Sequence, residues 1–187
     1  MERAAHGVRR RVVASLPVLL LAMLAWPGAG RTEAQTASAR DELLKDWLDM
    51  KASMHALAEA MPEDRFTFRA TPPQRDFAQQ VLHVANANVL NLRFLGGKAE
   101  APIIDRALTR KADVIAAMDR SFDYGEALLR EQTDESLRTV VQTNAFLGPS
   151  SRGRVVWFLL GHSWDIYGQM VVYVRLNGGT PPASQRP

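Results

Sequence analysis

The sequence predicts an all-α protein, an antiparallel four-helix bundle. Apolar residues recur every three or four positions over four separate stretches, which is typical of amphipathic helices. Segments that contain Pro or Gly separate these stretches, and none of them shows the alternation expected of a strand. Four amphipathic helices of similar length bury their apolar faces against one another in a bundle.

The first helix is expected to begin near Asp41, where a regular apolar seam starts, and to end at Pro62. The seam comprises Leu43, Trp47, Met50, Met54, Leu57 and Met61. A linker over residues 63–74 follows, and its Thr71-Pro72-Pro73 run cannot lie inside a helix. The second helix is expected from Arg75 to Leu95, because Gly96-Gly97 is a typical helix stop.

The third helix is expected over roughly Arg110 to Glu131, after a connection at 98–108, and Gly125 should weaken it locally. Residues 133–151 are the longest irregular stretch, within which Thr133 could cap a short helical turn. The last helix, about Arg152 to Leu176, follows the Gly-Pro-Ser-Ser breaker at 148–151, which also supplies an N-cap. Its seam comprises Val155, Leu159, His162, Ile166, Gln169 and Tyr173.

Residues 1–34 resemble a secretory signal peptide. Arg9-Arg10-Arg11 precede an apolar run from Val12 to Trp26, and helix breakers and small residues follow. Cleavage after Ala34 or near Gly30 would leave a short tether, residues 35–40, before a domain at 41–187. An uncleaved anchor is the alternative, although the run is shorter than the ~20 residues of a membrane span. We therefore expect a periplasmic or secreted protein that meets the membrane only through its signal segment.

Composition narrows the function further. Residues 1–34 carry five Arg and two Glu, so the rest of the chain holds 18 basic and 18 acidic residues, from totals of 23 and 20. This neutral body gives no support to nucleic-acid binding. The chain has no cysteine, which excludes disulfides, thiolate metal ligands and a cysteine nucleophile. The partners that remain are an unidentified small molecule and a second copy of the chain.

Two histidines on inner helix faces are the candidate site residues, His83 and His162. Helical bundles place metal and ligand sites between facing helices, and imidazole is a common metal donor. Asp165 lies three residues after His162 and could bind a metal itself or orient the histidine. A histidine on an apolar stripe is, however, more often a hydrogen-bonded core residue than a ligand. His55, beside the first seam, is expected at a boundary or exposed.

The chain resembles the DinB-like (DinB/YfiT-type) four-helix bundle family. The resemblance runs from Leu57-Ala58-Glu59-Ala60-Met61-Pro62-Glu63 and Phe66-Thr67-Phe68-Arg69, through Gln79-Gln80-Val81-Leu82-His83-Val84-Ala85, to Gly168-Gln169-Met170-Val171-Val172-Tyr173 and Pro181-Pro182-Ala183-Ser184. It implies a divalent metal, such as Zn, Ni or Fe, held by three histidines. His83 and His162 match two of them, but the third position is Ile166.

Isoleucine cannot bind a metal, so the resemblance implies a weak or absent metal site. Asp165 or Asn86 could supply a third donor, two histidines could bind alone, or Ile166 could fill a vestigial site. Characterised relatives include thiol S-transferases and isomerases that use the metal to activate a thiol. Two hypotheses follow: an exported small-molecule or weak metal-binding bundle, and a metal-dependent transferase or hydrolase with a degenerate site. Metal content and the effect of His162→Ala would discriminate between them.

Overall fold

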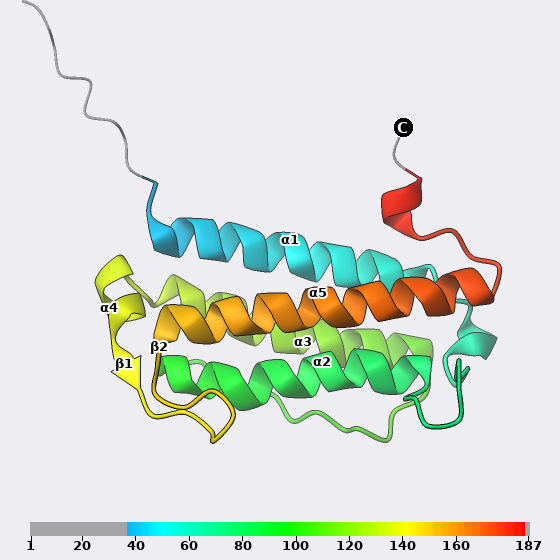
Figure 1. The fold of residues 1–187 in the computed structure, drawn as a ribbon, viewed down its shortest axis with the longest axis horizontal. Coiled ribbons are helices and arrows are strands. Elements are labelled where there is room, and N and C mark those ends of the chain that lie inside the picture. Colours follow the sequence, from blue (N-terminus) through cyan, green and yellow to red (C-terminus); the bar gives the residue numbers. More distant parts are fainter. Residues whose placement is uncertain (1–36, 186–187) are drawn as a thin grey trace, which may run out of the picture. The chain divides into compact units, whose positions relative to one another are not determined.

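The computed structural model describes residues 37–185, and its main elements are four long helices (Figure 1). These are α1 (Ala39–Glu59), α2 (Phe77–Leu92), α3 (Lys111–Arg130) and α5 (Arg152–Leu176). Shorter elements are α4 (Asp134–Arg138), the two-residue strands β1 (Val140–Val141) and β2 (Ser150–Ser151), and three 3₁₀ turns at Glu63–Arg65, Arg93–Leu95 and Pro182–Ser184. The predicted all-α four-helix bundle is confirmed.

The four helices surround one core, in which α1 and α2 lie on one diagonal and α3 and α5 on the other. Neighbouring helices are antiparallel in two cases: α1 with α3, where Lys111 reaches Glu59, and α2 with α5. The other two neighbouring pairs, α2–α3 and α1–α5, are parallel. The reason is the connection between α2 and α3, which runs back along the bundle before α3 begins (Figure 1).

Side-chain caps fix where the helices begin. Ser38 caps α1 by accepting a hydrogen bond from the Asp41 N–H, so this helix starts two residues before its predicted position. Asp76 and Gln79 form a reciprocal capping box at the start of α2. Thr133 caps α4 and Ser151 caps α5, as the sequence suggested.

The core confirms the predicted apolar seam of α1, whose six residues are all buried. Trp47 lies at its centre and donates a hydrogen bond from Nε1 to the Phe122 carbonyl oxygen at 2.9 Å. Gly125 is one turn beyond Phe122, and a Cβ there would overlap the Trp47 indole. The glycine expected to weaken α3 therefore makes room for the largest side chain of the core.

The predicted signal segment, residues 1–34, lies outside the described residues, as does the start of the tether. Within residues 37–185, no helix combines the length and the apolar character that a membrane crossing requires.

Candidate functional site

His83 on α2 and His162 on α5 lie against each other. Their ring centroids are 4.9 Å apart and the ring planes meet at 81°, an edge-to-face contact. Because α2 and α5 are antiparallel neighbours, the seam position of His162 comes level with the boundary position of His83. Phe158 stacks on the other side of His162, with centroids 6.1 Å apart and planes at 8°. The two helices therefore hold the imidazoles in one defined arrangement.

The histidine pair occupies the edge of the core and not its centre. Both side chains are half-buried, although the sequence placed them on inner helix faces. His162 lies at the border of the apolar face of α5, toward α2. Ile166, one turn later on the same helix, is buried at 3% exposure. The Nε2 atom of His162 is nevertheless buried and has no hydrogen-bond partner among the described residues.

A chain of polar side chains links α2 to α5 one turn from the histidines. Gln80 donates from Nε2 to Gln169 Oε1 at 2.8 Å, and Gln169 donates from Nε2 to Asp165 Oδ2 at 3.2 Å. Gln80 is almost fully buried, and its Oε1 acceptor has no partner within residues 37–185. Buried polar groups are normally hydrogen-bonded, so unpaired atoms on Gln80 and His162 indicate that this interface has capacity for a further polar group.

The electrostatic surroundings keep both imidazoles neutral. Burial lowers the pKa of His83 to about 4, helped by the positive charges of Arg75 and Arg106 and by repulsion from His162 whenever that ring is protonated. Burial also lowers the pKa of His162, although Asp165 acts in the opposite direction. At neutral pH both rings are therefore unprotonated, the form in which imidazole binds metals and accepts hydrogen bonds.

A pocket of about 330 Å³ near His83 is lined by Arg75, Gln79, Leu82 and Arg106, and His83 itself is not among its lining residues. Gln79 lies one turn before His83 on α2, and Leu82 is its direct neighbour. Arg75 immediately precedes the α2 cap, and Arg106 comes from the connection to α3. Sequence reasoning missed both arginines, since neither the residue before a cap nor a loop position has a periodic pattern to mark it.

The remaining predicted site residues do not complete a metal site. Ile166 is packed in the core, and Asp165 is exposed and accepts the hydrogen bond from Gln169. Asn86 is half-buried one turn after His83. In the described part of the chain, no three His, Cys, Asp or Glu side chains come together in a group able to hold a metal. The donors present thus do not fit a three-ligand site.

His55 lies elsewhere, on the α1–α3 side, as a half-exposed boundary residue. Its Nδ1 is 3.0 Å from Asp119 Oδ2. It does not contribute to the histidine pair.

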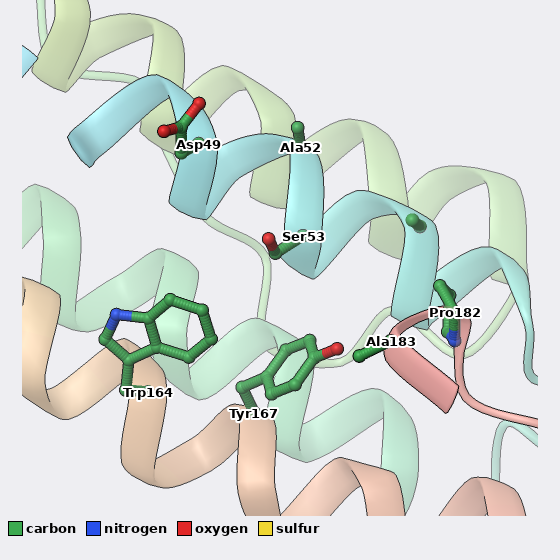
Figure 2. A pocket seen from close by; sticks show the side chains of 8 residues that line it. Asp49, Ala52, Ser53, Trp164, Tyr167, Pro182 and Ala183 are labelled. Carbon is green, nitrogen blue, oxygen red and sulfur yellow. The ribbon is translucent and has the colours of Figure 1, made fainter. Parts of the chain in front are cut away.

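A second, larger pocket of about 540 Å³ lies on the opposite side of α5, against α1 (Figure 2). Trp164 and Tyr167 project into it from α5 and meet edge to face, with centroids 5.4 Å apart. Small residues of α1 form the facing wall, and the Pro182–Ser184 turn closes one end (Figure 2). Its one carboxylate, Asp49, is already paired with Lys45 at 2.5 Å.

Comparison with known proteins identifies the fold of this bundle. The sequence profile of the DinB superfamily matches residues 46–170. A DinB-like protein of Bacillus cereus ATCC 10987 is similar in structure, with a TM-score of 0.66 and 23% identity over 76% of this chain and 95% of that one. A DinB-like protein of Bacillus subtilis, YjoA, gives a TM-score of 0.61 and 16% identity over 78% and 99%. No curated protein shows a significant match.

Proposed function

The chain belongs to the DinB superfamily, and we propose that it is an exported member that binds a small molecule beside the His83–His162 pair and retains only weak affinity for divalent metals. Export follows from the signal-like residues 1–34. Family membership supports the location of the site but not an activity, since one fold serves many functions.

The observation that carries the proposal is the contact of two neutral imidazoles next to a pocket. The rings meet at 4.9 Å between helices α2 and α5, and the adjoining pocket has the size of a small-molecule site. The polar side chains that line this pocket are those of Arg75, Gln79 and Arg106. Small-molecule sites commonly combine such a concave pocket with a few convergent polar groups.

Metal chemistry is not part of the proposed mechanism, because the donor set is incomplete. Catalytic zinc sites use three protein ligands and keep one position open. Here two nitrogen donors are present, and the buried Ile166 side chain lies where the third would come from. The alternative hypothesis, a metal-dependent transferase or hydrolase, would require Asp165 or Asn86 to turn into the site.

Calorimetric titration with Zn²⁺ and with Ni²⁺ tests the metal part of the proposal. We expect weak binding by the wild type and binding at least ~10-fold tighter by Ile166→His, because positions 162 and 166 share a helix face and a third nitrogen donor is restored. Trp164→His is the matched control, since it adds a histidine to the same helix on the side of the second pocket. It should leave the affinity unchanged.

Other outcomes would overturn this part of the proposal. Tight wild-type binding that His162→Ala abolishes would favour the metal-dependent enzyme. Equal gains from Ile166→His and Trp164→His would show that position 166 has no special relation to the pair.

Export has its own test. Expression of the full chain in a bacterial host, followed by mass spectrometry of the periplasmic fraction, should give a protein that lacks residues 1 to about 34. An intact N-terminus on membrane-extracted protein would contradict the proposal.

A further inference from the structure

Arg75 and Arg106 line the pocket beside His83, and no carboxylate pairs with either of them in the described residues. The arginines that do form ion pairs are Arg40, Arg65, Arg69, Arg110 and Arg130. Two guanidinium groups from separate segments thus face one small pocket with their charges uncompensated. Both arginines are exposed, so each can reach an anion that enters the pocket from solvent.

The neighbouring acidic residues are already engaged. Asp76 accepts a hydrogen bond from the Gln79 backbone N–H at 2.8 Å and lies 3.5 Å from the Arg69 guanidinium. Asp105, beside Arg106 in sequence, is exposed and accepts a hydrogen bond from the Ala107 N–H at 2.9 Å. Neither carboxylate forms an ion pair with Arg75 or Arg106, and the charges of both arginines lower the pKa of His83.

The other lining residues suit a small organic anion. Gln79 uses its Oε1 to accept from the Asp76 N–H at 3.1 Å, which leaves its Nε2 amide group as a hydrogen-bond donor. Leu82 lies beneath the pocket as part of the core, with 1% of its surface exposed. The Arg75 backbone is held in place, because the Tyr173 hydroxyl of α5 donates to its carbonyl oxygen at 2.6 Å. The pocket thus combines two cations and one neutral donor.

We propose that the small molecule bound beside His83 is an organic anion, a carboxylate or a phosphate, whose oxygens are held by Arg75 and Arg106. This inference rests on the proposed function and names its ligand class. Guanidinium is suited to both anions because its planar fork of N–H donors matches two oxygens at once.

Succinate and its neutral diamide, succinamide, test the proposal because they have the same number of heavy atoms and differ in charge. Each is titrated into the protein at low salt while the histidine side-chain resonances are followed by NMR, and inorganic phosphate is titrated in parallel. We expect saturable shifts of His83 with succinate or phosphate and none with succinamide. Comparison of the two anions distinguishes a carboxylate from a phosphate ligand.

Substitutions then locate the binding. Arg75→Gln and Arg106→Gln should each weaken anion binding about tenfold, because each removes a charged hydrogen-bond donor. Arg120→Gln is the control: it removes the same charge from an exposed position on α3 that does not line the pocket. Circular dichroism melting curves establish that each variant is folded.

The outcomes separate the inference from the function on which it rests. Equal shifts from succinate and succinamide would overturn the anion assignment and leave a small-molecule site beside His83 intact. Equal losses from Arg120→Gln and Arg75→Gln would show diffuse surface attraction and would also overturn the assignment. If none of the three compounds shifts His83, both the anion and the small-molecule site at this pocket are contradicted.

Discussion

Two pockets of the described residues differ in character. The smaller one lies at the start of α2, near the histidine pair, and is lined by two arginines without carboxylate partners among those residues. Toward α1, a larger pocket is walled by Trp164, Tyr167 and small residues, and its one carboxylate is neutralised by Lys45. Pocket volume alone would favour a ligand site on the α1 side. The stronger indication of a ligand is on the α2 side, where the buried Gln80 Oε1 and His162 Nε2 atoms have no hydrogen-bond partner among the described residues.

The largest difference expected between the two sides concerns stability. Ile166→Ala on the α2 side should lower the free energy of unfolding by about 2–5 kcal/mol, because it leaves a cavity in the core. Trp164→Ala on the α1 side should cost less than about 1 kcal/mol, since the indole is 53% exposed. Urea denaturation of both variants measures the difference. A larger loss from Trp164→Ala would mean that the α1 pocket is part of the core.

A smaller difference is expected between two tyrosines of α5. Tyr173→Phe removes the hydroxyl that holds the Arg75 carbonyl oxygen and should cost about 1 kcal/mol of unfolding free energy. It should also weaken succinate or phosphate binding, because Arg75 loses its anchor. Tyr167→Phe, in the α1 pocket, should change neither quantity measurably. Identical effects of the two substitutions would remove the proposed link between α5 and the arginine pocket.

A pH dependence is expected from the histidine pair. Because the pKa of His83 is about 4 in the folded protein and near 6.5 when unfolded, the unfolded chain binds more protons between these values. Stability should therefore fall as the pH drops from about 6.5 toward 4, and be fully present at neutral pH. Comparison of denaturation midpoints at pH 7 and pH 4.5 measures this, and His83→Gln should flatten the profile whereas Tyr167→Phe should not. An unchanged slope in His83→Gln would assign the effect to other groups.

Sequence reasoning could predict the features that a periodic apolar pattern or a local capping motif encodes. The four helices, the buried α1 seam and the caps at Thr133 and Ser151 were predictable, because helix periodicity and capping chemistry are encoded within a few residues. The meeting of His83 and His162 was expected from the family resemblance, since contacts between helices far apart in sequence depend on the topology.

Features set by loops were not predictable. The parallel α1–α5 and α2–α3 pairs follow from the path of the connection over residues 96–110, which no periodic pattern describes. The same connection brings Arg106 to Arg75, so the arginine pocket was missed for the same reason. The packing role of Gly125 was also not predictable. Helix propensity describes one helix alone, whereas the glycine at this position makes room for Trp47 from another helix.

The clamp between α4 and the start of α1 limits how far the N-terminus can be trimmed. The Asp134 carboxylate accepts hydrogen bonds from the Ser38 hydroxyl at 2.7 Å and the Arg40 N–H at 2.8 Å, and these bonds lower its pKa. A truncated chain that begins at Asp41, the boundary suggested by periodicity, would lose both bonds together with the α1 cap. One that begins at Ala37 would keep them. Proteolytic nicking between these two positions should therefore release the first turn of α1 and leave Asp134 exposed to water.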